Sequence, residues 1–175
     1  MLGGVGNVVR NLSTLATETY LVSLLGDDLA SKEVEKKLNN INVYNNLIKD
    51  PSGPTIIKSR FIANNQQILR VDKEKITSIN KKIEKKVYEF SKKQILKTNA
   101  VVISDYNKGL ITENILKKII SFAKIHKKPI IVDPKSSNFS KYRGATIITP
   151  NIKELELSLI HISEPTRRTP ISYAV

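Results

Sequence analysis

Short apolar segments that alternate with amphipathic helical patterns constrain the fold of this chain more than any other feature. Apolar runs typical of buried strands occupy residues 20–25, 100–104, 129–132 and 146–148. Helical patterns occupy residues 7–15, 29–39, 79–96 and 113–126, and a further one begins near residue 152. Either Asp27 or Asp28 is expected to cap the helix that starts at Leu29. The alternation predicts an α/β fold, a parallel sheet with helices on both faces.

One segment breaks this alternation. Residues 55–63 and 67–72 are typical of two strands joined by a turn at Asn64 and Asn65, with no helix between them. We therefore expect a β-hairpin inserted at about residues 55–72. It carries four polar side chains that can reach a ligand, namely Lys58, Arg60, Gln67 and Arg70. An arginine there can bind a phosphate group through two parallel hydrogen bonds, although an exposed basic hairpin without a ligand explains the same residues.

Polar residues follow three of the predicted strands. Asp105, Asp133 and Asn151 each stand just after a strand end. Right-handed crossovers bring the carboxyl ends of parallel strands to one edge, where doubly wound sheets bind their ligands. We therefore predict a ligand site at this edge, with Lys135 placed to meet an anionic group. Asp105 can equally be a residue that only caps its own turn.

The charge of the chain raises a different class of function. With 29 basic and 16 acidic residues the formal net charge is +13, a balance that fits a nucleic-acid-binding protein. The lysines, however, occur mainly as pairs on the polar faces of the predicted helices, and no basic motif with interleaved aromatic residues is present. We interpret them as solvated helix faces. A basic nucleic-acid-binding α/β module stays as the alternative from a different class.

Composition also bears on the location of the protein. The sequence has no cysteine, which excludes disulfides, Cys-based zinc sites and thiolate nucleophiles within it. No apolar run is long enough to span a bilayer, and the first residues lack the pattern of a signal peptide. We therefore expect a cytoplasmic protein with no membrane partner.

Four segments carry short motifs whose order and spacing are informative together. They are GGVGNVVRN at residues 3–11, KSRFIANNQQILRVDKE at residues 58–74, SDYNKG at residues 104–109, and the series DPK, YRGAT and TPN at residues 133–135, 142–146 and 149–151. This set resembles the ribokinase-like, or PfkB, family of carbohydrate kinases, and within it the kinases of D-glycero-D-manno-heptose 7-phosphate. The resemblance covers nearly all of residues 3–156.

The resemblance implies a ribokinase-like fold in which the hairpin is a lid. It implies ATP-dependent phosphorylation of heptose 7-phosphate at O1, with Mg²⁺, in the synthesis of ADP-heptose for lipopolysaccharide. A sugar phosphate and ATP would then be the small-molecule partners. Another PfkB-family sugar kinase is the nearest alternative, because this fold accepts many sugars.

The resemblance also assigns roles to residues. Substrate contacts fall on Gly4, Asn7, Lys58, Arg60, Gln67, Arg70 and Asp105, and nucleotide contacts fall on Asp133, Lys135, Asn151 and Glu154. In the motif that runs from Asn151 to Glu154, the glutamate would act on Mg²⁺ through water. A helix capping box explains the same pair equally well, with Asn151 as the cap. Asn7 has a similar alternative as the cap of the first helix.

The resemblance further implies an incomplete domain. We expect residues 1–156 to be a partial kinase domain that lacks the first strand, upstream of Gly3, and the late Gly-Ala-Gly-Asp segment that carries the catalytic aspartate of the family. No catalytic residue is therefore assigned within the chain, and the isolated chain is predicted to be inactive. The sequence leaves open a homodimer of the full-length protein and a fused nucleotidyltransferase domain.

Residues 157–175 differ from the rest. Their sequence, LSLIHISEPTRRTPISYAV, back-translates in order and in one reading frame to the adapter that is ligated to DNA in short-read sequencing libraries. We therefore expect this segment to be a translated adapter and not native protein, so that native sequence would end near Glu156.

Overall fold

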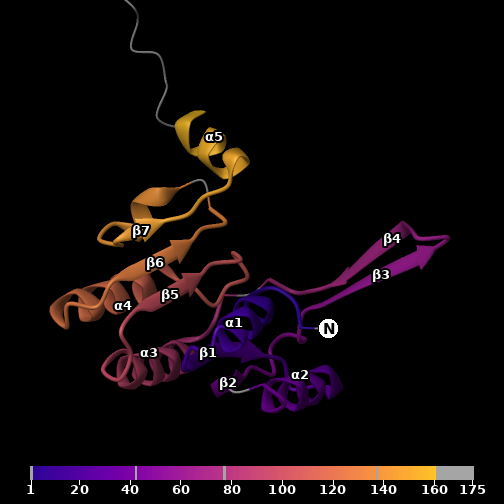
Figure 1. The fold of residues 1–175 in the computed structure, drawn as a ribbon, viewed down its shortest axis with the longest axis horizontal. Coiled ribbons are helices and arrows are strands. Elements are labelled where there is room, and N and C mark those ends of the chain that lie inside the picture. Colours follow the sequence, from indigo (N-terminus) through magenta and orange to yellow (C-terminus); the bar gives the residue numbers. More distant parts are fainter. Residues whose placement is uncertain (1, 42, 77, 137, 161–175) are drawn as a thin grey trace, which may run out of the picture.

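The computed structural model describes residues 2–41, 43–76, 78–136 and 138–160 (Figure 1). Its elements, in chain order, are α1 (Val5–Thr14), β1 (Thr19–Leu25), α2 (Leu29–Asn39), β2 (Val43–Lys49), β3 (Ile57–Ala63), β4 (Gln66–Lys73), α3 (Lys81–Ile95), β5 (Val101–Ser104), α4 (Glu113–Ile125), β6 (Ile130–Asp133), the 3-10 helix η1 (Phe139–Tyr142), β7 (Ile147–Ile148) and α5 (Ile152–Ile160). Residues 161–175, most of the segment expected to be a translated adapter, lie outside the described residues. Among the described helices, none is long and apolar enough to cross a membrane.

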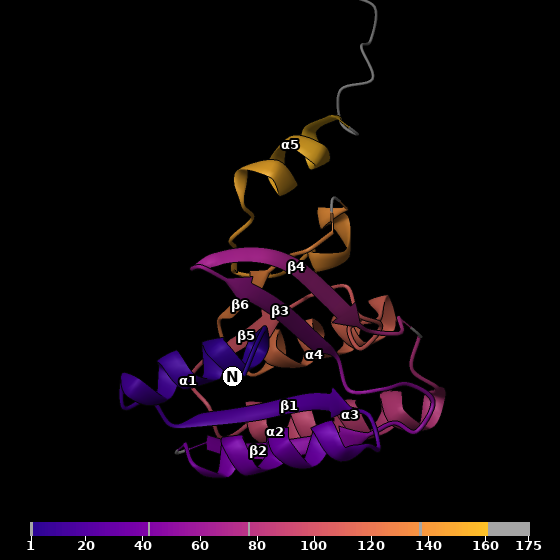
Figure 2. The same cartoon turned by 90° about the vertical axis from the view of Figure 1, so that its right-hand side faces the viewer.

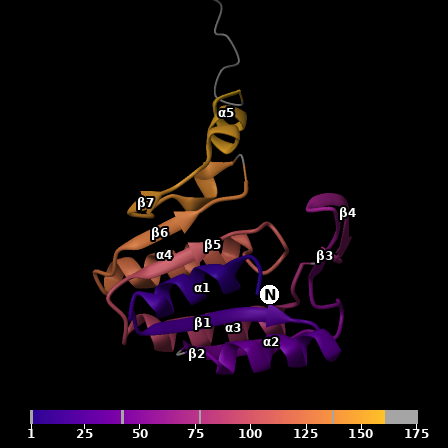
Figure 3. The same cartoon turned by 45° about the vertical axis from the view of Figure 1, so that its right-hand side comes forward.

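Two groups of parallel strands form the body of the fold. β1 pairs with β2, while β5, β6 and β7 pair in that order, and each of these pairings is parallel. In the described part of the chain, β1 has a strand partner on one side only, and so does β5. α1 lies on one side of the strands, and α3 and α4 lie on the other (Figures 2 and 3). The predicted parallel α/β arrangement is therefore confirmed, but its strands form two groups.

The main core lies between α3 and α4 and the strands β5 and β6. Helix α4 buries one face, at Ile115, Leu116, Ile119, Ile120 and Ala123. This face packs in one cluster with Ile103 of β5 and with Ile130 and Val132 of β6. Burying a side chain of this size contributes about 1.5–3 kcal/mol, so this cluster supplies most of the hydrophobic stabilisation. A smaller cluster of buried residues, Val9, Leu21 and Leu38, joins α1, β1 and α2.

Side-chain caps fix where three helices begin. Asp28, Asn80 and Thr112 each accept a hydrogen bond from the backbone N–H three residues on, at 2.9, 2.9 and 3.1 Å. Asp28 is therefore the cap of α2, one of the two residues that the sequence predicts. Its carboxylate also accepts from the Thr55 backbone N–H at 2.9 Å and from the Thr55 hydroxyl at 2.7 Å. These bonds lower the pKa of Asp28 and tie the start of α2 to the segment before the hairpin.

β3 and β4 form the predicted hairpin, which projects away from the body (Figure 1). Both turn residues, Asn64 and Asn65, have left-handed backbone conformations, with φ of 49° and 61°, and asparagine tolerates these better than most residues. One face of the hairpin is apolar and exposed, with Phe61, Leu69 and Val71. An isolated two-stranded hairpin has little stability of its own, so its attachment to the body matters.

The sequence does not predict two of the elements. β2 contains Asn45 and Asn46, which disfavour strands, but its parallel pairing with β1 from Val43 to Lys49 outweighs that preference. The helix η1 makes a single turn, which is too short to show a helical period. Its Tyr142 is nonetheless fully buried.

Candidate functional site

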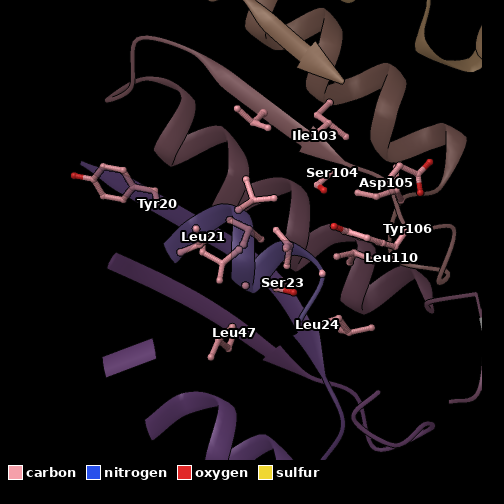
Figure 4. Close-up of a pocket in the computed structure, with 18 of the residues that line it drawn as sticks. Tyr20, Leu21, Ser23, Leu24, Leu47, Ile103, Ser104, Asp105, Tyr106 and Leu110 are labelled. Atoms are coloured by element: carbon pink, nitrogen blue, oxygen red, sulfur yellow. The ribbon is translucent and has the colours of Figure 1, made fainter. Parts of the chain in front are cut away.

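The carboxyl ends of β5, β6 and β7 lie at one edge, as their parallel order predicts. The backbone N–H of Asp105 donates to the carbonyl of Asp133 at 2.9 Å, so the residues at the ends of β5 and β6 are adjacent. Beside this edge, a cavity of about 1290 Å³ lies between β1 and β5. Leu21 and Leu24 of β1 and Ile103 of β5 line this space (Figure 4). The predicted ligand edge therefore adjoins a large cavity.

The glycine segment that leads into α1 forms part of the cavity wall. Gly4 adopts φ 51° and ψ −129°, a conformation that favours glycine, and a Cβ there would stand 3.5 Å from the Tyr106 ring. Gly4 is also the residue that precedes α1, so Asn7 is not the helix cap. Asn7 lines the cavity, and its Oδ1 atom is buried without a hydrogen-bond partner among the described residues. An amide in this state suits a ligand hydroxyl.

Ion pairs arrange the charged face of the hairpin. Lys58 lies opposite Asp72 and Arg60 lies opposite Arg70, so the four side chains share one face. Asp72 pairs with Lys58 at 3.2 Å and with Arg70 at 3.0 Å; burial opposes its ionisation, but both cations outweigh burial and lower the pKa of Asp72. Lys58 and Arg60 line the cavity, and Arg70 does not. Gln67 pairs with Ile62, beyond a register shift at Phe61 and Ile62 that interrupts strand alternation, and it does not line the cavity.

Asp105 is enclosed by donors from its own chain and is 1% exposed. Its Oδ2 atom accepts from the Tyr142 hydroxyl at 2.6 Å and from the Lys141 ammonium at 2.8 Å. Its Oδ1 atom accepts from the backbone N–H of Asn107 at 2.8 Å, which is the turn cap that the sequence leaves as an alternative. Burial and the Asp105 carboxylate together raise the pKa of Tyr142 well above its usual value. Tyr142 therefore stays a proton donor to Asp105.

The sequence does not predict the side chains that bind Asp105. Neither Lys141 nor Tyr142 is predicted as a site residue; the one signal that could have indicated Tyr142 is that a buried tyrosine needs a partner for its hydroxyl. The sequence also does not predict the pair between Lys108 and Glu74, 2.7 Å apart, which joins the loop after β5 to the residue after β4. The paired residues are 34 and 37 positions apart in the chain, so no local spacing reveals them.

Lys135, Asn151 and Glu154 form a second cluster, outside the cavity. The Lys135 ammonium lies 2.5 Å from Glu154 Oε1. The Asn151 N–H donates to Glu154 Oε2 and the Glu154 N–H donates to Asn151 Oδ1, both at 2.9 Å. This reciprocal pair is the capping box that the sequence leaves as an alternative to a metal site.

The charges of this second cluster support one another. Burial opposes ionisation of Glu154, but the Lys135 ammonium and the Asn151 N–H outweigh burial and lower the pKa of Glu154. Glu154, and Asp133 to a lesser degree, raise the pKa of Lys135. Among the described residues, no group of three or more His, Cys, Asp or Glu side chains could hold a metal. One carboxylate fits Mg²⁺ that is bound mainly by water and phosphate oxygens.

Comparison with known proteins finds a matching family model and similar curated proteins. A family model described as pfkB family carbohydrate kinase matches residues 1–165. The bifunctional protein HldE of Aliarcobacter butzleri (strain RM4018) is 40% identical over 157 residues, which cover 89% of this chain and 33% of that protein. HldE of Helicobacter pylori (strain HPAG1) is 40% identical over 159 residues, or 90% of this chain and 34% of that protein. The chain thus spans about a third of the length of these curated relatives.

Solved structures share the fold. A putative phosphofructokinase from Staphylococcus aureus superposes with a TM-score of 0.67 at 20% identity, over 91% of this chain and 51% of that one. The tetrameric inhibited form of phosphofructokinase-2 from Escherichia coli gives a TM-score of 0.66 at 19% identity, over 89% and 51%. These likenesses confirm the predicted fold class.

Proposed function

Because the chain belongs to the pfkB family of carbohydrate kinases, we propose that residues 1–156 are part of a kinase that transfers the γ-phosphate of ATP to O1 of D-glycero-D-manno-heptose 7-phosphate. The product would serve the synthesis of ADP-heptose for lipopolysaccharide, in the cytoplasm. The proposal rests on one observation: five of the residues that the heptose-kinase resemblance assigns to the substrate line the same cavity. They are Gly4, Asn7, Lys58, Arg60 and Asp105.

The chemistry of these residues suits a phosphorylated sugar. Lys58 and Arg60 supply two cations on the hairpin face that meets the cavity, and a guanidinium can hold a phosphate through two hydrogen bonds. The buried amide oxygen of Asn7 can accept from a sugar hydroxyl. Because the hairpin projects from the body beside the cavity, it can cover a bound sugar and exclude water.

The second cluster is proposed to take ATP and Mg²⁺. Lys135 would meet a phosphate as a point charge, Asn151 and Asp133 would lie beside the nucleotide, and Glu154 would hold water on the metal. Mg²⁺ bound there supplies charge stabilisation to the transferring phosphate. The pairing of Lys135 with Glu154 keeps both groups charged at neutral pH, which supports this assignment.

We propose that a further strand of the longer protein completes the sheet between β1 and β5. In the described residues, β1 and β5 each have a strand partner on one side only, and both line the cavity. Besides Asn7 Oδ1, two buried polar atoms of the cavity lining, Ser104 Oγ and Gln94 Oε1, have no hydrogen-bond partner among the described residues. The catalytic aspartate is proposed to belong to a segment outside this sequence, so the isolated chain would be inactive.

The test uses the whole protein, expressed from its complete coding sequence. Heptose 7-phosphate should give the highest kcat/KM among sugars offered with and without a phosphate. Arg60→Ala should raise KM for heptose 7-phosphate by about tenfold, because a charge-assisted bond to phosphate is lost. Arg10→Ala, at an exposed arginine of α1 that does not line the cavity, is the matched control.

Two outcomes would favour the alternatives. A higher kcat/KM for an unphosphorylated hexose would overturn the heptose assignment and leave another pfkB-family sugar kinase. Salt-sensitive DNA binding without kinase activity would favour the nucleic-acid-binding module.

We also propose that residues 157–175 are not native. Sequencing of genomic DNA across codon 156 should show a reading frame that continues into a Gly-Ala-Gly-Asp segment; a genome that encodes LSLIHISEPTRRTPISYAV would overturn this.

We propose in addition that the full-length protein is a homodimer. The exposed apolar face of the hairpin, with Phe61, Leu69 and Val71, supports the homodimer. Sedimentation of the full-length protein tests it.

A further inference from the structure

The loop after β5 contacts η1, the glycine segment and the base of the hairpin. We call residues 105–109 the β5 loop. Asp105 is bound by Lys141 and Tyr142 of η1. The ring of Tyr106 lies against Gly4 in the glycine segment, and the Lys108 ammonium binds the carboxylate of Glu74 at the base of the hairpin.

We propose that Lys141 and Tyr142 are positioning residues for the sugar side of the site. They hold Asp105 in one orientation, and through the β5 loop they set where the glycine segment and the base of the hairpin stand. The inference deepens the proposed function and rests on it. Neither side chain is among those that line the cavity, so both act through Asp105 and not on the sugar.

Burial makes this arrangement rigid. Asp105 is 1% exposed, Tyr142 is 0% exposed, and the side chain of Lys141 is 10% exposed. A buried carboxylate is stable only when cations and hydrogen-bond donors compensate for its lost hydration. Lys141 supplies the positive charge, and the Tyr142 hydroxyl supplies a directed bond at 2.6 Å. Because water cannot easily replace either donor, loss of one changes how the carboxylate is oriented.

The orientation of Asp105 passes to the glycine segment through the backbone. The Asp105 carboxylate accepts from the N–H of Asn107, a residue in the left-handed region with φ 53°. This bond fixes the turn that carries Tyr106, which is one of the residues that line the cavity (Figure 4). A Cβ on Gly4 would be only 3.5 Å from that ring, so a displaced Tyr106 moves or releases the start of α1, where Asn7 stands.

The second branch runs to the hairpin. Lys108 and Glu74 are 2.7 Å apart, and their side chains are 27% and 23% exposed. Glu74 follows β4 directly, so the pair anchors the carboxyl end of the hairpin to the β5 loop. The same loop therefore aligns both proposed walls of the sugar site, the glycine segment and the basic face of the hairpin.

The first test is kinetic and uses the complete enzyme. Tyr142→Phe removes the hydroxyl and keeps the ring, and Lys141→Met removes the charge. Each should raise KM for the sugar phosphate by about tenfold, the effect of losing one bond to a buried charge, while KM for ATP stays unchanged. Lys141→Arg should leave KM for the sugar phosphate at its native value, because arginine keeps the positive charge. Tyr88→Phe, in a partly buried tyrosine of α3 packed against the same core, is the matched control.

An unchanged KM for the sugar with a lower melting temperature would show a merely structural role and overturn the inference. An equal rise of KM for ATP would do the same. If the native enzyme phosphorylates a different sugar, the proposed acceptor fails, and the same comparison is made with that sugar.

A second test does not depend on activity. In the 175-residue chain, Tyr142→Phe should increase amide hydrogen exchange in residues 3–7 and 73–76 and leave the buried face of α4 protected. Lys108→Met, at a pair less buried than Asp105, should increase exchange in residues 73–76 alone. Increased exchange over the whole chain, or none in residues 3–7 for Tyr142→Phe, would contradict the proposed transmission.

Discussion

The sequence predicts several residues of the two clusters, but it does not predict which side chains they bind. Asp105 could be singled out because it follows a strand end at the edge where parallel sheets bind ligands, and Glu154 because the family resemblance assigns a role to the motif that begins at Asn151. Their partners could not be predicted, because Tyr142 and Lys135 come from distant positions and meet them only in the folded chain. The motif around Asn151 fits a capping box and a metal site alike; the structure shows the capping box, and the metal role stays a proposal.

Gly4, on the cavity wall, should tolerate substitution poorly because of its backbone conformation. Its backbone, at φ 51° and ψ −129°, is strained for any residue with a Cβ, at about 1–3 kcal/mol. Gly4→Ala should lower the free energy of unfolding of the chain by about that amount, measured by urea denaturation. Gly3→Ala is the matched control, because among the described residues no atom beyond its chain neighbours lies within 4 Å of a Cβ built there. Equal losses in both variants would contradict the strain argument.

Lys135→Met should change how stability depends on acid. The pKa of Glu154 in the folded chain lies below its ordinary 4.5, so the stabilisation is fully present above the unfolded pKa and is lost as pH falls through the folded value. The variant should be less stable at pH 7 by roughly 0.5–1 kcal/mol, since the Lys135 side chain is partly exposed and solvent screens the pair. The difference between variant and native chain should vanish in acid, as urea denaturation at several pH values would show. A constant difference would exclude the ion pair as its cause.

At the scale of elements, hydrophobic periodicity predicts long helices and buried strands well. The helix from Leu29 to Asn39 and the Asn64-Asn65 turn are found as predicted. β2 is missed because its asparagines hide its strand character, which comes only from pairing with β1. η1 is missed because one turn of helix leaves no periodic signal.

Asp28→Ala should cost more stability than Asn80→Ala. Both residues cap a helix, and loss of a cap costs about 1 kcal/mol. Asp28 additionally accepts two hydrogen bonds from Thr55, so its loss also releases the segment before the hairpin. Urea denaturation of the two variants gives the comparison, and equal costs would show that the Thr55 bonds add nothing.

At the scale of the whole molecule, one helix connects the two groups of strands on the side opposite α1. α3 contacts β1 and β2 as well as α4, while β1 and β5 do not pair in the described part of the chain. The group that contains β1, β2 and α2 has a small buried cluster, and the group around α4 has the large one. Unequal local stability follows from this division.

The 175-residue chain should therefore unfold in more than one step. Amides of residues 19–49 should exchange with deuterium at lower urea concentration than amides of residues 101–133, because less apolar surface protects them. Hydrogen exchange followed by mass spectrometry resolves the two segments. A single transition shared by both segments would show that α3 couples the groups fully.

The space between β1 and β5 also has a consequence inside a living cell. In the described part of the chain, β1 and β5 each leave an unpaired edge beside an apolar cavity, and chaperones and proteases act on such surfaces. A cell that produced these 175 residues alone should therefore keep them in small amounts, because degradation would shorten their half-life. If the longer protein supplies the strand proposed between β1 and β5, its abundance at equal messenger levels should exceed that of this chain.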